Sequence, residues 1–155
     1  MRNKVISVAE AVAMIPDGAT IMCGGFLGCG SAHHIIEALA EKGTNCLLYT
    51  SDGLGGVLTP TGVGTIVEDS PYCLGKQTID GKEYLLMKPI RADFALINGH
   101  IVDQFGNIWY KGTTRNFNIV MATAADVVIA EGDNLVEIGD IEPENVVTSG
   151  AFVNY

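Results

Sequence analysis

The chain has 155 residues, of which 48% are hydrophobic and 17% charged, and this composition predicts a folded domain rather than a disordered chain. A formal net charge of −9 with no basic run argues against nucleic acid as a partner, since such binding depends on clustered lysine and arginine. The longest mainly apolar run, residues 119–130, contains Asp126 and is shorter than the roughly 20 residues that span a bilayer. We therefore expect no membrane association.

The N-terminal segment superficially resembles a signal peptide, but Glu10 interrupts its apolar stretch. We therefore expect a cytoplasmic protein. The four cysteines are scattered, without a C-x-x-C motif or a histidine pair at ligand spacing, so no structural metal is expected. The histidines, His33, His34 and His100, are expected at the surface or at caps rather than as general bases.

The first third of the chain predicts a strand, a glycine-rich loop, a helix and a second strand, which is the pattern of a parallel sheet. Ser7 and Glu10 form a capping-box signal for the first helix. In chain order the sequence predicts a helix over 7–15, a strand over 20–23, the glycine loop 24–30, a helix over 32–42 capped by Ser31 and stopped by Gly43, and a strand over 46–50.

The remainder is predicted to hold a second glycine-rich loop, a hairpin and several short strands. Asp80-Gly81 is a typical hairpin turn. The expected elements are the loop 53–65, hairpin strands over 77–79 and 83–87, strands over 92–98, 101–102 and 108–110, a helix over 118–125, a strand over 127–131 and an edge strand at 146–147. We expect a single α/β domain over 1–155, with an open, mainly parallel sheet flanked by helices.

The glycine loop that follows the first strand carries the clearest functional signal. Four glycines within seven residues, Gly24, Gly25, Gly28 and Gly30, leave the backbone bare where the strand ends and a helix begins. In open α/β sheets, ligands bind at this edge. Backbone amides at a helix N-terminus suit a phosphate, a carboxylate or a developing oxyanion.

The segment 17–30 resembles the signature of the α (A) subunits of family I coenzyme A transferases. That signature has an acid and a glycine, two free positions, three apolar residues, Gly-Gly-Phe, three free positions, a glycine, a free position and a proline. Cys23 at the third apolar position and Ala32 in place of the proline are its two departures. Further segments resemble the family in the same order, namely 53–65, 80–86, 89–97, 106–107, 110–118 and 148–150. The likeness is greatest to subunits that act on acetate, butyrate and acetoacetate.

The resemblance implies a transferase that moves coenzyme A from a short-chain acyl-CoA to a carboxylic or 3-oxo acid. The family's nucleophile is a glutamate in a Ser-Glu-Asn-Gly motif of the β (B) subunit, and this chain lacks that motif. We therefore expect no catalytic residue in this chain, a β-subunit partner in an α2β2 heterotetramer, and coenzyme A bound as substrate rather than as a permanent cofactor. Glu10, Glu68 and Glu131, the nearest candidates for a nucleophile here, lack the motif's context.

The resemblance also implies which residues wall the active site. The expected binding residues for coenzyme A and substrate are Gly24, Gly25, Phe26, Gly28, Gly30, Gly55, Gly56, Thr59, Pro60, Thr61 and Gly62. Arg115 and Asn116 are candidates to face the substrate carboxylate or the coenzyme A phosphates, with a structural hydrogen-bonding role as the alternative. Glu131 follows a buried strand and is a candidate at the ligand edge, with a solvated strand end as the alternative.

One block of the family pattern is missing. Family α subunits have a long stretch between the second strand and the second glycine loop, whereas here Asn45 leads almost directly to Gly53 through Cys46-Leu47-Leu48-Tyr49-Thr50-Ser51-Asp52. The start of this bridge, Cys-Leu-Leu-Tyr-Thr-Ser, matches one translated frame of a transposon end used to prepare sequencing libraries. We hypothesise an assembly chimera with a deletion junction at 46–52. A natural deletion with a chance match is the alternative.

A deletion here leaves the parallel sheet incomplete and its edges unpaired, because a cut through the sheet removes pairing that loops do not replace. We therefore expect poor solubility and little or no activity from this chain as it stands.

Two other functions fit parts of the sequence. A dinucleotide-binding domain would use Asp52, about 20 residues past Gly30, as the ribose-binding acid. The loop reads G-G-x-x-G-x-G rather than G-x-G-x-x-G, which disfavours this function. A non-catalytic relative that keeps the fold without the chemistry is the second alternative.

Overall fold

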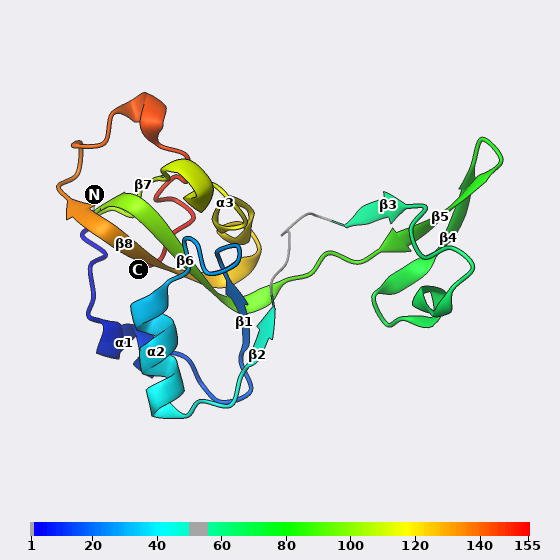
Figure 1. The fold of residues 1–155 in the computed structure, drawn as a ribbon, viewed down its shortest axis with the longest axis horizontal. Helices are drawn as coiled ribbons and strands as arrows, with labels where there is room; N and C mark the ends of the chain where they lie inside the picture. The colour runs from blue at the N-terminus through cyan, green and yellow to red at the C-terminus, as the bar shows by residue number, and fades with distance from the viewer. Residues whose placement is uncertain (1, 50–55) are drawn as a thin grey trace. The chain divides into compact units, whose positions relative to one another are not determined.

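The computed structural model describes residues 2–49 and 56–155, and the chain forms two compact units (Figure 1). The first unit combines Met1–Asp52 with Ala92–Tyr155, and the second is Gly53–Arg91. Each unit has its own sheet, so the second glycine-rich segment and the first belong to different units. Residues 50–55, which include Gly55 and the last three residues of the expected junction, lie outside the described residues.

The first unit contains an open, mainly parallel sheet, as predicted. Its strand order is β2-β1-β6, with β8 on the other side of β6 and β7 antiparallel to the far half of β6. β1 is parallel to both β2 and β6, and β8 is parallel to β6 along its length. The strands are β1 (Thr20–Cys23), β2 (Leu47–Tyr49), β6 (Ala92–Asp103), β7 (Ile108–Trp109) and β8 (Ala125–Val136).

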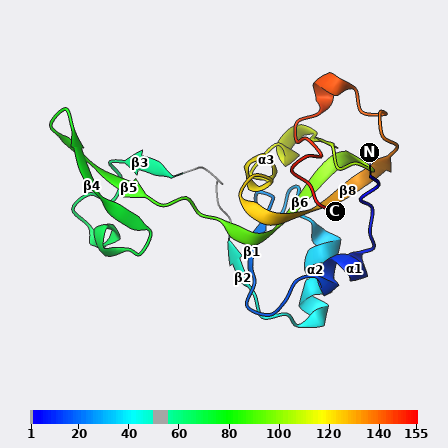
Figure 2. The ribbon, with the colours of Figure 1, turned by 180° about the vertical axis from the view of Figure 1, so that it is seen from behind.

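The main hydrophobic core lies between this sheet and two helices, α1 (Val8–Ala13) and α2 (His33–Lys42). Both views show α1 and α2 together on one side of the sheet and α3 (Asn118–Met121) on the other (Figures 1 and 2). The buried side chains that form this core come from both helices and three strands, and include Val12, Ile15, Ile21, Ile35, Leu39, Phe94, Leu96 and Ile129.

Both helix ends that the sequence marked most clearly are confirmed. The Ser7 hydroxyl accepts a hydrogen bond from the Glu10 amide, and the Glu10 carboxylate accepts one from the Ser7 amide, which completes the capping box. Gly43 ends α2 with a left-handed φ of 72°, and its amide donates to the Ala40 carbonyl. No helix among the described residues is long and apolar enough to cross a membrane.

The strands in the second half of the chain are longer than predicted. The segments 92–98 and 101–102 form one strand, β6, and the expected strand 127–131 extends over Ala125–Val136. β8 pairs with β6 along the whole of β6, and the backbone hydrogen bonds of this pairing extend β8 over the polar residues that follow Ala130. The helix predicted over 118–125 is only Asn118–Met121. No strand forms at 146–147, where Val147 donates to the Ile108 carbonyl beside an isolated bridge at Thr148.

The second unit is a small antiparallel sheet of order β3-β5-β4, formed by β3 (Val57–Thr59), β5 (Lys82–Met87) and β4 (Cys73–Ile79). The predicted hairpin at Asp80-Gly81 is confirmed, with φ values of 51° and 78° that suit a two-residue type I′ turn. A 3-10 turn, η1, covers Ile66–Asp69. The expected loop 53–65 therefore includes a strand at 57–59, because these residues pair with β5.

Ile21 lies at the centre of the first unit and is fully buried on β1. We expect Ile21→Ala to lower the free energy of unfolding by about 2–5 kcal/mol, because it removes buried methyl groups and leaves a cavity. Ile138→Ala makes the same chemical change at an exposed position and should shift stability by about 0.5 kcal/mol or less. Urea unfolding measures both, and equal losses would contradict the placement of Ile21 in the core.

Candidate functional site

The first glycine loop forms a tight turn at the end of β1. The Gly24 amide donates to the Leu96 carbonyl at 2.8 Å, which continues the pairing of β1 with β6. Phe26 and Cys29 exchange two backbone hydrogen bonds, both of 3.0 Å, around Leu27 and Gly28. Leu27 and Gly28 have φ values of 50° and 83°, so they form a two-residue turn in the left-handed region.

The tip of this turn is apolar and exposed. Leu27 is 91% exposed and Phe26 is 57% exposed, and the Phe26 ring lies 6.3 Å from the ring of Phe117. Leucine seldom adopts a positive φ, so the tip holds a backbone conformation that the rest of the loop must stabilise. The loop therefore has one defined backbone conformation.

The N-terminus of α2, the helix that follows the loop, differs from the prediction in its capping residue and in what its amides bind. Ser31 does not cap α2; the N-cap residue is Ala32, without a side-chain hydrogen bond. Glu131 of β8 accepts hydrogen bonds from the amides of His34, at 3.3 Å, and Ile35, at 3.1 Å. The amides expected to bind an anion at this helix N-terminus thus bind Glu131, because the sheet brings the middle of β8 next to the start of α2.

Glu131 also binds the side chain of His34. The His34 Nδ1 atom lies 2.6 Å from Glu131 Oε1, and this hydrogen bond raises the pKa of His34 above its ordinary value. The carboxylate therefore has three partners in the first turn of α2. In this structure Glu131 caps the first turn of α2, and its place at a ligand-binding edge stays a prediction.

The side chains of Arg115 and Asn116 bind backbone carbonyls, and Asn116 reaches the glycine loop. Asn116 Nδ2 donates to the Cys29 carbonyl at 3.0 Å and to the Thr113 carbonyl at 2.8 Å. Arg115 Nε donates to the Tyr110 carbonyl at 3.3 Å. Asn116 therefore supports the outer end of the loop, which is the structural alternative that the sequence left open.

Half-buried Cys23 and buried Tyr110 are unsuited to acid–base or nucleophilic work at neutral pH. Burial raises the pKa of the Cys23 thiol, at the end of β1, to about 11. Burial also raises the pKa of Tyr110 to about 12, and its hydroxyl lies 2.8 Å from the Thr148 hydroxyl. Both groups stay protonated at neutral pH.

The second glycine segment belongs to the other unit. Gly56 and Gly62 have φ values of 97° and 88°, which explains glycine at both positions. Thr59 is the last residue of β3, and its hydroxyl accepts from the Thr61 amide at 3.1 Å. Pro60 follows β3 directly.

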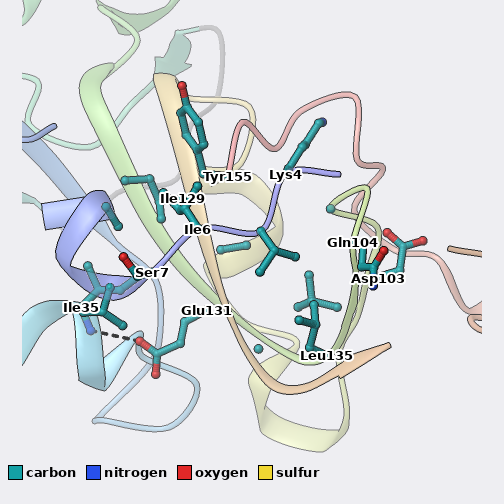
Figure 3. A pocket seen from close by; sticks show the side chains of 17 residues that line it. Lys4, Ile6, Ser7, Ile35, Asp103, Gln104, Ile129, Glu131, Leu135 and Tyr155 are labelled. Carbon is teal, nitrogen blue, oxygen red and sulfur yellow. Dashed lines mark hydrogen bonds between the residues drawn. The ribbon is translucent and has the colours of Figure 1, made fainter. Parts of the chain in front are cut away.

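A cavity of about 200 Å³ in the first unit lies apart from the glycine loop (Figure 3). It lies between the N-terminal segment and β8, with Ile6, Ile35, Ile129 and Leu135 among its lining. Lys4 reaches its rim, and its ammonium donates to the carbonyls of Gly150 and Val153. Glu131 is the one predicted site residue that lines this cavity, and Figure 3 shows its carboxylate turned toward Ile35 at the start of α2.

A model of the coenzyme A transferase family matches residues 5–53 and 51–155, which together cover nearly the whole chain. The chain belongs to this family. It is 35% identical, over 100% of its length and 96% of the relative, to acetate CoA-transferase subunit alpha of Escherichia coli K12. It is 34% identical to the acetoacetyl-CoA:acetate/butyrate CoA transferase alpha subunit of Clostridium acetobutylicum, over 100% and 97% of the two chains.

Solved structures of the family share the fold. An acyl-CoA transferase of Escherichia coli O157:H7, solved as a thioester complex with CoA, superposes with a TM-score of 0.79 at 20% identity. The match covers 99% of this chain and 46% of that one. The predicted α/β architecture is thereby confirmed.

The comparisons also expose the missing block. The alignment with the Escherichia coli alpha subunit has 215 positions and this chain has 155 residues, so at least 60 positions lack a residue of this chain. The two matches of the family model meet at residues 51–53, at the end of the predicted junction 46–52. The relative therefore has positions that this chain lacks, and the family model matches the chain in two pieces that overlap next to the expected junction.

The Glu131 cap can be tested through the titration of His34. We expect Glu131→Gln to lower the pKa of His34 toward its ordinary value of 6.5, because the hydrogen bond to Glu131 is the main cause of the increase. NMR titration of the His34 ring measures this change. Glu37→Gln is the matched control, since Glu37 is the smallest contributor and its removal should lower the pKa less.

The same pair should make stability depend on pH. Since the pKa of His34 is raised in the folded state, its contribution is fully present below about 6.5, the unfolded value, and is lost as the pH rises through the folded value. The difference in unfolding free energy between the wild type and His34→Gln should therefore shrink at alkaline pH. A difference that grows with pH would contradict the pairing.

Proposed function

We propose that this chain is the α subunit of a heteromeric CoA-transferase that exchanges coenzyme A between a short-chain acyl-CoA and a carboxylic or 3-oxo acid, of the acetate, butyrate and acetoacetate class. The observation that carries the proposal is the similarity, from end to end of the chain, to subunits whose names state these substrates. Coenzyme A acts here as substrate and leaves with the product.

The state of the chain's own glutamates supports a nucleophile from the partner subunit. Glu10 is held by the capping box, and Glu131 by the first turn of α2. Glu68 lies 2.8 Å from the Lys76 ammonium and accepts from the Gly64 amide. These three residues, the candidates considered from the sequence, already serve local structure. As the family resemblance implies, we propose that the attacking carboxylate belongs to the β subunit, in a complex that we propose to be α2β2 and cytoplasmic.

The proposed contribution of this chain is a wall of the active site. We propose the loop of Gly24, Gly25, Gly28 and Gly30 as this wall. Gly28 is exposed and Gly30 half-buried, so a thioester and a partner could approach the backbone closely there, whereas Gly24 and Gly25 are buried beneath the turn. Amides fixed in position favour the negative charge that develops on the thioester oxygen as it is attacked. We propose the same close approach at Gly55, Gly56, Thr59, Pro60, Thr61 and Gly62.

Dinucleotide binding fits the structure poorly. That function needs the N-terminal amides of the helix after the first strand for a pyrophosphate, and Glu131 occupies two of them. A bound pyrophosphate would also face the Glu131 carboxylate, with like charges in contact. The proposed ribose ligand, Asp52, lies outside the described residues.

The test separates the family function from the effect of the deletion. Two versions of the chain are co-expressed with the β subunit from the same source: the chain as it stands, and a restored chain with the missing segment of the Escherichia coli relative inserted at residues 51–53. Acetyl-CoA and butyrate are supplied, and butyryl-CoA is measured. We expect the restored pair to form butyryl-CoA, and a β subunit with glutamine in place of its motif glutamate to abolish the reaction.

The chain as it stands should be poorly soluble and give less than a tenth of the restored activity, because its sheet lacks pairing. Full activity of the unrestored pair would overturn the deletion argument. A restored chain that folds and binds β, yet forms no product with acetate, butyrate or acetoacetate as acceptor, would overturn the proposed function.

A further inference from the structure

Asn118, the first residue of α3, connects the glycine loop to the rest of the first unit. Its side chain is fully buried, which is unusual for an amide. It lies in the segment 110–118, which resembles the family, yet it was not among the predicted site residues. We infer that Asn118 is a positioning residue that fixes the shape of the glycine loop; its meaning for catalysis rests on the proposed function.

The amide of Asn118 bonds three separate segments. Its Nδ2 atom donates to the Gly30 carbonyl at 2.9 Å, at the end of the loop, and to the Thr114 carbonyl at 3.2 Å, in the 3-10 turn η2 (Gly112–Thr114). Its Oδ1 atom accepts from the Asn98 amide of β6 at 3.1 Å. One side chain thus holds the end of the loop against the central strand.

The start of the loop packs on the same amide. A Cβ atom at Gly24 would overlap Asn118 Oδ1, so this position has room only for glycine while Asn118 is present. The constraint is steric, because Gly24 does not adopt a positive φ. Both ends of the loop, six residues apart in the sequence, therefore meet at Asn118, and the turn between them has little freedom.

Only an amide satisfies these contacts. The site needs a donor for two carbonyls and an acceptor for a backbone amide, on one planar group. Aspartate would keep the acceptor but leave the carbonyls of Gly30 and Thr114 facing a buried negative charge. Asn116 adds a second, weaker tie through the Cys29 carbonyl. The loop is thus set before any substrate arrives, as electrostatic preorganisation requires.

The steric contact gives a double-mutant test. Gly24→Ala alone should push the loop away from β6. An Asn118→Ala background removes the two atoms nearest to the added methyl group, Asn118 Oδ1 and Cγ, and the next nearest atom, Ile97 Cα, lies 3.4 Å away. We expect Gly24→Ala to raise the hydrogen-exchange rate of the Phe26 and Cys29 amides at least tenfold in the wild type and less than threefold in Asn118→Ala. Equal effects in the two backgrounds would overturn the contact.

The matched substitutions Asn118→Asp and Asn134→Asp test the positioning role. Asn134 is an exposed amide whose Nδ2 donates to the His100 carbonyl, so its change is chemically identical but remote from the loop. We expect Asn118→Asp to speed exchange at Phe26 and Cys29 at least tenfold while the Ala95 amide of β6 stays protected. Uniform acceleration across the unit would show a purely structural role. Asn116→Ala, a milder variant, should loosen the Cys29 end of the turn alone.

Kinetics link the loop to the reaction. In the restored enzyme paired with β, Asn118→Asp should lower kcat at least tenfold and change the KM for acetyl-CoA less than threefold, since the loop acts on the developing charge. If the loop becomes disordered and kcat does not change, Asn118 fixes the loop but does not contribute to catalysis. An inactive wild-type pair with a loop that depends on Asn118 would overturn the proposed function and not this inference.

Discussion

The parallel pairing of β6 with β8 is the constraint on which the functional edge of the first unit depends. It runs from Ala92 opposite Ala125 to Asp103 opposite Val136, so it sets the position of every residue at the carboxyl end of both strands. Glu131 comes to lie opposite Asn98, while β1 ends beside Leu96 on the other side of β6. The start of the glycine loop, the middle of β8 at Glu131 and the first turn of α2 are thereby brought together.

Side chains of Glu131 and Asn118 form hydrogen bonds with backbone groups of α2, the glycine loop and β6. Glu131 takes the amides at the start of α2, and Asn118 takes the carbonyl at the end of the loop and the Asn98 amide. Dinucleotide-binding folds bind an anion at the N-terminus of this helix. Here Glu131 occupies the amides that such a site would use. The glycine loop presents a rigid turn with an exposed apolar tip at Phe26 and Leu27, which suits a wall that a partner subunit completes.

The expected deletion junction directly follows a strand of the same sheet. Among the described residues β2 pairs with β1 alone, so it lies at the edge of the sheet, directly before the break at 51–53. An edge strand presents unpaired backbone groups, which favours association with other chains. The loop and its supports come from residues outside the break, so the geometry around Asn118 survives in a chain that lacks the block.

The sequence by itself determined the family and the turns and helix ends that depend on neighbouring residues. Capping residues at Ser7 and Glu10, the glycine at position 43 and the Asp80-Gly81 turn act through neighbours in the chain, so their patterns were sufficient. Only the tertiary structure decided the length of β8, the cap of α2 by Glu131 and the contact of Asn118 with both ends of the loop. These depend on residues 20 to 97 positions apart, which sheet pairing brings together and no local pattern records.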